Sequence, residues 1–558
     1  MWINCTVLLG AAVAGLFVVG CAQAAPPQGE APAAEVKAVP DPYRPDPSRC
    51  EPDKEWWRVP GPPIRGGVAQ MVQTDIGHAD LTRPDRGNRP GWRVYQELLV
   101  TRGCYSGDVT VVPYLAKAWE VSPDGLTWTL KLRDNVRWHN KPPVNGRPFT
   151  SADVGWSIDN HLAGSIVRSN WSRVESHREP DPHTVVLRLN EPDADFALQM
   201  AYRDNVMLAR EVKEQYGDFK SVAIGTGPYL VREIKPELEI TVDRNPDYWE
   251  MGVDGKPLPY LEGVHYVRLE YTAEVAAMRT GQLDVGGTLA YRKLDWEAMR
   301  RGNPKLVPFE ALQATYHGVW FNHQSKPWDD VRVRKAVSLA LEREDLVASN
   351  RGGVALSGFI PPFFKDYSWP EATIKERFKR DLPKAKALLK EAGYGSGDIK
   401  AVLKTSSVYA EDAEVVQRQL KELGIETTID SVQGAFTPVV RKKEFDIATG
   451  VIGGSPLVGY FGGQVPRSGS SFNYWNLADP EVDRLADAQS RELDPAKRKQ
   501  VIDRLQDRLY EVMAWAPTVS RIYFYLYSCR AKNMMYIPSN LTQNDQFPTH
   551  MWLDPSGC

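Results

Sequence analysis

A glycine-rich stretch in the carboxyl-terminal third of the chain is the first candidate for binding chemistry. Residues 445–452 read as a strand, and the stretch 450–463 that continues from it contains six glycines. Glycine has no Cβ, so backbone N–H groups there can approach a ligand closely. We therefore predict ligand contact in this loop, at positions such as Gly453 and Gly454; a merely flexible loop is the alternative.

The usual motifs of catalysis are missing from the sequence. Lys256 is followed by proline rather than Ser or Thr, and Leu230 stands where a dinucleotide fingerprint needs its third glycine. The nine histidines form no H-E-x-x-H motif, and the segment 453–457 lacks the closing glycine of a nucleophile elbow. We therefore expect no enzymatic activity, no cofactor and no bound metal.

The elements that would position the loop follow an α/β pattern. A strand at 399–404, a helix at 413–423 closed by Gly424, and a strand at 425–429 predict a right-handed parallel crossover. In open α/β sheets, ligands bind beyond the carboxyl ends of the strands, which is where the loop begins. Asp330 and Asp381 are predicted to cap two further helices.

The segment 64–310 has a different predicted secondary structure. Residues 64–310 read as short strands separated by turn signals, of which 125–132 and 183–189 alternate with a period of two. These two segments are predicted to be strands with one solvated face. Helices and strands alternate only from about residue 325 onward.

Length and charge limit the function further. The 558 residues predict three to four domains, and the net charge is −3 with 68 Lys+Arg against 71 Asp+Glu. Nucleic-acid-binding domains concentrate positive charge, so we expect no nucleic-acid partner. The mean hydropathy of −0.41 predicts a water-soluble body.

The amino terminus is typical of an exported protein. Residues 7–19 form an apolar run of signal-peptide length, followed by a lipobox-like 18–21 that would make Cys21 a lipidation site. A competing small-x-small cleavage site lies at 22–24, no Lys or Arg lies near Met1, and an uncleaved anchor is a further alternative. We predict a signal peptide at 1–21 and a proline-rich tether at 22–63.

Cysteine usage agrees with export. Outside the signal and lipobox, four cysteines remain: Cys50, Cys104, Cys529 and Cys558. In an oxidising compartment these four predict two disulfides with three possible connectivities, among which the sequence does not choose. Four unpaired thiols are the alternative.

A series of spaced motifs resembles the extracytoplasmic solute-binding proteins of family 5. They are 115–133, 136–139, 149–154, 225–229, 245–249, 278–284, 321–322, 330–336 and 384–394. The resemblance covers nearly the whole body and implies a two-lobed periplasmic-binding-protein fold of type II. It implies a first lobe at 64–99, 222–312 and 530–558, an inserted subdomain at 100–221, and a second lobe at 313–529.

The resemblance also implies where a ligand would bind. Residues 315–320 resemble the first hinge segment, with Tyr316, His317 and Trp320, and Arg521 lies on the second hinge crossing. The strand end from Thr449 to Ser455 resembles the ligand-contacting loop of peptide-binding members. Ile452 and Ser455 stand where those members carry an aromatic residue and an aspartate that pairs with the peptide amino group. A serine offers an ammonium only a neutral hydrogen bond, so capture of a free amino group is in doubt unless another carboxylate, Asp446 or Asp479, replaces the aspartate.

The implied function is the binding component of an ABC importer, with permease and ATPase subunits as partners. The expected ligand is a peptide or peptide-like molecule, captured by a monomer tethered outside the cytoplasmic membrane. The alternatives are a non-peptide solute, such as an oligosaccharide or, less favoured, nickel, and a lipoprotein without transport function.

Overall fold

The computed structural model describes residues 61–557, apart from 74–75, 84–92, 104–108, 221, 348–352, 434–435, 437–439, 453, 456 and 535–546. The predicted signal peptide and lipidation site, nearly all of the tether, and Cys50, Cys104 and Cys558 lie outside the described residues. Within them, Cys529 is disulfide-bonded. No helix of the described part is both long and apolar enough to cross a membrane.

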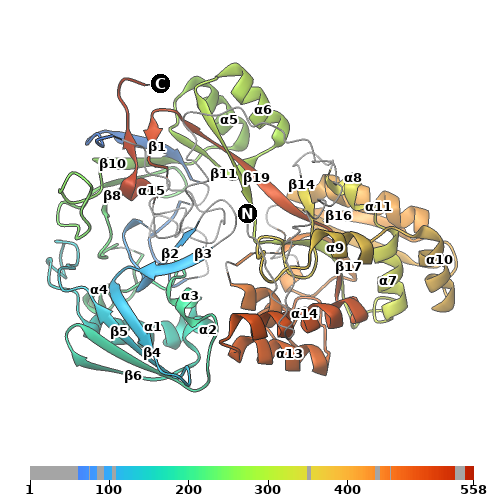
Figure 1. Ribbon diagram of the computed structural model, residues 1–558. Helices are drawn as coiled ribbons and strands as arrows, with labels where there is room; N and C mark the ends of the chain where they lie inside the picture. The colour runs from blue at the N-terminus through green and yellow to red at the C-terminus, as the bar shows by residue number, and fades with distance from the viewer. Residues whose placement is uncertain are drawn as a thin grey trace, which may run out of the picture. The chain divides into compact units, whose positions relative to one another are not determined.

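The largest sheet, here called the first sheet, combines segments from distant parts of the chain (Figure 1). Its order is β12-β19-β11-β1-β10-β9-β8, with β14 also paired to β19. One face packs in a core with helices α5 (Tyr271–Thr280) and α6 (Lys293–Gly302), and a separate core contains Val264 and Tyr229. The strands are β1 (Val68–Val72), β8 (Tyr229–Lys235), β9 (Glu239–Arg244), β10 (Gly263–Val267), β11 (Val285–Tyr291), β12 (Leu306–Leu312), β14 (Gly353–Leu356) and β19 (Val519–Ser528).

A four-stranded antiparallel sheet with its own hydrophobic core lies within the predicted inserted subdomain. Its order is β4-β5-β7-β6, and β5 and β7 confirm the two strands predicted from alternation. The elements of this region are β2 (Leu99–Gly103), β3 (Val109–Pro113), β4 (Ala116–Val121), β5 (Thr127–Leu132), α1 (Ser151–Gly164), α2 (Arg168–Trp171), β6 (Val174–Asp181), β7 (Thr184–Leu189), α3 (Phe196–Met200) and α4 (Arg210–Tyr216).

The second sheet has the order β16-β15-β17-β13-β18. The predicted caps are confirmed: the Asp330 side chain accepts from the backbone N–H of Arg332 at the start of α7, and Asp381 does the same for Lys384 at α10. The elements are β13 (Tyr316–Phe321), α7 (Val331–Ala340), α8 (Arg343–Val347), α9 (Glu371–Arg377), α10 (Leu382–Glu391), β15 (Lys400–Ser406), η3 (Ser407–Tyr409), α11 (Ala410–Leu423), β16 (Glu426–Val432), β17 (Ile447–Ile452), η4 (Tyr460–Gln464), α13 (Pro480–Arg491), α14 (Pro495–Val512) and β18 (Trp515–Pro517).

The predicted parallel crossover is confirmed, because β15 and β16 pair in parallel and α11 connects them. Gly424 ends the helix with a φ of +94°, a conformation that glycine adopts without strain. Near the carboxyl terminus, the short elements α15 (Phe547–His550), β20 (Ala531–Lys532) and β21 (Trp552–Leu553) complete the described structure.

The prediction of one continuous loop at 450–463 is wrong in its second half. Residues Tyr460–Gln464 form a π-helical turn, and Phe461 is fully buried. A Cβ on Gly459 would lie 1.9 Å from the Asp195 carboxylate, and one on Gly463 would lie 2.8 Å from the Gln489 amide. These two glycines allow close packing within the protein, which the sequence pattern could not distinguish from ligand access.

The chain passes twice between the two sheets, and the two passages run side by side. The first joins β12 to β13 and the second joins β18 to β19. Gln313 N–H donates to the Arg521 carbonyl at 3.1 Å, and Thr518 N–H donates to the His317 carbonyl at 3.0 Å. β19 lies within the range expected for the second lobe but pairs with β11 and β12 of the first sheet.

Candidate functional site

Five side chains gather where the two passages meet the second sheet: His317, Tyr409, Asp412, Thr518 and Arg521. We call them the hinge cluster. His317 lies on β13, Tyr409 ends the turn that follows β15, and Asp412 lies in the first turn of α11. The turn that carries Tyr409 begins at the carboxyl end of β15, which is where α/β sheets place their ligand-contacting groups.

Arg521 holds the cluster together. Its Nη2 donates to Asp412 Oδ2, and its Nε donates to His317 Nε2 at 3.1 Å. The side chains of Arg521 and Asp412 are only 2% and 4% exposed. A charge-assisted hydrogen bond of this kind is stronger than a neutral one, so the pair fixes the position of α11 relative to β19.

The hydrogen bonds of His317 define its tautomer. Arginine is only a donor, so Nε2 must accept from Arg521 and carries no proton. The proton therefore lies on Nδ1, which is 3.4 Å from Thr518 Oγ1 and donates to it. His317 is consequently neutral, although its Nε2 is also 3.4 Å from Asp412 Oδ2.

Two aromatic rings, one of them Tyr409 of the cluster, pack in series beside His317. The Tyr409 ring meets the His317 ring edge to face, with centroids 5.3 Å apart, and the Phe436 ring lies 6.4 Å from Tyr409 in the same manner. Phe436 in turn packs against Gly450 of β17, where a Cβ would lie 2.8 Å from the ring. Only glycine at this position leaves room for Phe436.

We expect the substitution Gly450→Ala to displace Phe436 and to cost about 1–3 kcal/mol of stability, because the added methyl group overlaps the ring. The measurement is the free energy of unfolding by denaturant. Gly462→Ala is the matched control, since its Cβ would make ordinary contact, 3.5 Å from Leu505. Equal stability of the two variants would contradict the expectation.

Comparison with known proteins shows the family of the chain. The model of the Bacterial extracellular solute-binding proteins, family 5 Middle, matches residues 110–470. The chain belongs to this family. Among curated relatives, the glutathione-binding protein GsiB of Salmonella typhi is 27% identical over 450 residues, which is 76% of this chain and 83% of GsiB.

Solved structures of family 5 type share the fold. The periplasmic binding protein DppA from Helicobacter pylori, in complex with the peptide STSA, aligns with a TM-score of 0.73 at 22% identity, over 88% of this chain and 98% of DppA. AgaA of A. tumefaciens, in complex with agropinic acid, aligns with a TM-score of 0.73 at 23% identity, over 87% and 98% of the two chains. The two-lobed fold that the motifs implied is thus confirmed.

Some of the residues predicted to bind ligand lie in β13 and β17, two paired strands of the second sheet. Tyr316 and Ile452 pair across β13 and β17. The Thr449 hydroxyl donates to the Gly318 carbonyl at 3.2 Å, so this side chain serves the sheet. Beyond the strand, Ser455 is 6% exposed, and its Oγ accepts from Leu457 N–H at 3.1 Å. Gly454 precedes it, and Gly453 lies outside the described residues.

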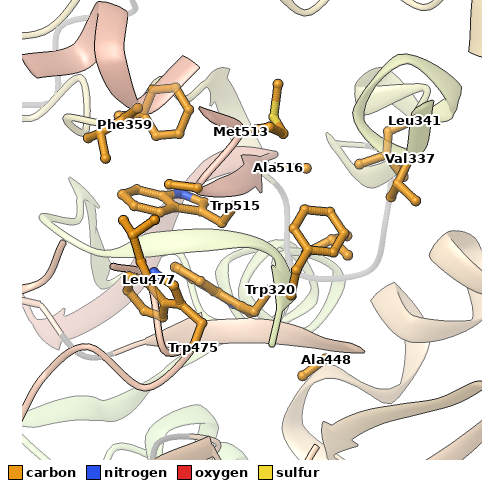
Figure 2. Close-up of a cluster of buried hydrophobic side chains, with 14 of the residues drawn as sticks. Trp320, Val337, Leu341, Phe359, Ala448, Trp475, Leu477, Met513, Trp515 and Ala516 are labelled. Atoms are coloured by element: carbon orange, nitrogen blue, oxygen red, sulfur yellow. The ribbon is translucent and has the colours of Figure 1, made fainter. Parts of the chain in front are cut away.

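Trp320 lies in the core behind the site. Its side chain is fully buried and stacks with Trp475 and Trp515, at centroid distances of 4.8 and 5.4 Å (Figure 2). Its Nε1 donates to the Gly450 carbonyl at 3.1 Å. Trp320 therefore supports the strand that carries Gly450 from within the core.

The sequence reasoning found His317 and Arg521 but missed Asp412 and Tyr409. The carboxylates considered as replacements are elsewhere: Asp479 caps α13 and pairs with Arg508, and Asp446 lines an open pocket of 470 Å³ with Lys404 and Asp430. The available signal for Asp412 was its place in the turn between a predicted strand and a predicted helix.

The described residues hold no group of three or more His, Cys, Asp or Glu placed to bind a metal ion. His323, the second histidine considered for a metal, hydrogen-bonds through Nε2 to the Ala514 carbonyl at 2.8 Å. Burial and the nearby charge of Arg334 lower the pKa of His323 to about 3, which keeps it neutral.

Proposed function

We propose that this chain is the extracytoplasmic binding component of an ABC importer, and that it captures a peptide or peptide-like solute between its two lobes. The observation that carries the proposal is the hinge cluster, in which Arg521 of the first sheet contacts His317 of the second sheet and Asp412 of α11, the helix between two strands of the second sheet. A ligand bound there contacts groups from both lobes. Such a ligand makes more contacts in the closed form than in the open form, and only this difference in affinity can drive closure.

The protein acts without catalysis, and its partners are the permease and ATPase subunits of the importer. Its amino terminus carries a signal peptide and a lipidated Cys21, followed by the tether 22–63, so that a monomer works outside the cytoplasmic membrane. The proposed ligand contacts are the hinge cluster and the stretch 449–455.

The names of the relatives support a peptide ligand. GsiB is a glutathione-binding protein, and DppA was solved with a peptide. A second candidate is a non-peptide solute, because AgaA, which has the same fold, was solved with agropinic acid.

A thermal-shift screen against di- to pentapeptides, short oligosaccharides and nickel tests the proposal. A ligand at a thousandfold excess over its Kd is expected to stabilise the protein by about 4 kcal/mol. Stabilisation by peptides supports the proposal, and stabilisation by oligosaccharides alone supports the second candidate. No stabilisation by any peptide would overturn peptide capture.

A further inference from the structure

The charges of the hinge cluster cancel within the protein. Arg521 and Asp412 are oppositely charged and directly hydrogen-bonded, and His317 is neutral in the tautomer described above. The cluster therefore offers no uncompensated charge to a ligand. This observation bears on which ligands the site accepts, and the inference drawn from it rests on the proposed function.

The cluster does retain one unused hydrogen-bond donor. Arg521 Nη1 is buried and has no hydrogen-bond partner among the described residues, although Nε and Nη2 are both engaged. At the carboxyl end of β15, Ser406 Oγ is likewise buried without a partner in the described part of the chain. A buried donor without an acceptor is costly, and a ligand oxygen would satisfy it.

The hydrogen bonding of Ser455 also favours an acceptor oxygen on the ligand. Its Oγ already accepts from the backbone N–H of Leu457, which leaves the hydroxyl proton to donate. An acceptor oxygen on the ligand would use that proton, and Ser455 brings no negative charge to balance an ammonium group.

A charged ligand group would be at a disadvantage here. An ammonium or a carboxylate placed beside the cluster loses its hydration and finds no free counter-charge, because Arg521 and Asp412 already neutralise each other. An uncharged carbonyl oxygen satisfies the Arg521 donor without adding charge. We propose that the hinge cluster selects ligands whose segment at this position is uncharged, such as an internal peptide unit or a blocked terminus, held by an oxygen that accepts from Arg521 Nη1.

The first test measures binding of trialanine and pentaalanine in four forms by calorimetry: unmodified, amino-acetylated, carboxyl-amidated and blocked at both ends. The four forms of a peptide are expected to bind with Kd values within about threefold of one another. A loss of about tenfold or more on acetylation or amidation would overturn the inference while leaving peptide capture intact. Failure of every form to bind would overturn the proposed function, and the inference with it.

The second test removes each charge of the Arg521–Asp412 pair in turn. In Asp412→Asn the Arg521 charge is uncompensated, and we expect a preference of about tenfold for peptides with a free carboxylate over their amides. In Arg521→Gln, Asp412 loses its arginine counter-charge, and the expected preference is about tenfold for a free amine over the acetylated form.

The matched control is Arg334→Gln. Arg334 is another buried arginine, but its guanidinium donates to backbone carbonyls, including those of Trp328 and Met513, in the core of the second lobe. This variant is expected to keep the end-group selectivity of the unmodified protein. Circular dichroism shows whether each variant is folded; if one is not, the four-form comparison on the unmodified protein decides alone. Folded cluster variants with unchanged selectivity would overturn the inference.

Discussion

Replacing Asp195 with alanine is expected to lower the free energy of unfolding by about 3–5 kcal/mol. Asp195 directly precedes α3 and pairs with Arg498 of α14, through two hydrogen bonds of 2.8 Å. The two side chains are 10% and 6% exposed, and Arg498 also donates to Gln489 Oε1. Removing the carboxylate leaves a buried guanidinium without its counter-charge, and this accounts for the size of the loss. Denaturant unfolding of the full chain measures it.

Two further variants separate this cause from general disruption. In Asp195→Ala with Arg498→Met both charges are removed, so most of the lost stability is expected to return. Arg491→Ala is the matched control, because Arg491 pairs with Glu191 between the same two parts of the chain, but the Arg491 side chain is half exposed. Its expected cost is below about 1 kcal/mol. A cost as small as this for Asp195→Ala would show that the buried pair contributes little.

Acidification from pH 7 to pH 5 is expected to destabilise the protein through three buried histidines. Burial, the largest influence on each, lowers the pKa of His139 and of His161 to about 4 and that of His323 to about 3. Between these values and the ordinary pKa of about 6.5, the unfolded chain binds protons that the folded chain does not, so stability falls as pH falls. Each histidine is expected to contribute about 2 kcal/mol of loss at pH 5.

Single substitutions test the sign of this effect. His323→Gln keeps a donor for the Ala514 carbonyl but does not titrate, so the loss between pH 7 and pH 5 is expected to shrink by about 2 kcal/mol. His177 is the opposite control: burial lowers its pKa, but hydrogen bonds with Asp159 and Glu179 raise it overall. Its stabilisation is present below the unfolded pKa and is lost as pH rises through the folded value, so His177→Gln should enlarge the loss on acidification. Equal pH dependence in all three proteins would contradict the assignment.

Local sequence was enough to predict several helices and strands of the second sheet and the helices around it. Asp330 and Asp381 cap helices in the structure as predicted, because a capping side chain acts on backbone groups only two or three residues away. The β15-α11-β16 crossover was predictable for the same reason, since periodicity and Gly424 are local signals. Gly459 and Gly463 were misassigned because Asp195 and Gln489, the groups that they approach, are distant in sequence.

The candidate site was only partly predictable. Resemblance to a family pointed to His317 and Arg521, one beside each passage between the two sheets. The contact of Arg521 with Asp412 depends on how α11 packs beside β19, and no spacing in the sequence encodes a contact over 109 residues. The same limit explains Trp320, which shares a strand with His317 but lies in the tryptophan core (Figure 2).

The stacked tryptophans behind the site give the protein an intrinsic optical reporter. Trp320, Trp475 and Trp515 lie close enough for their indole transitions to couple, which produces strong near-ultraviolet circular dichroism. Trp320 is hydrogen-bonded to the carbonyl of Gly450, and the Phe436 ring occupies the space that a Cβ on that residue would need. A movement of Phe436 or of the strand that carries Gly450 would change the surroundings of this chromophore, so tryptophan emission would report it without any label.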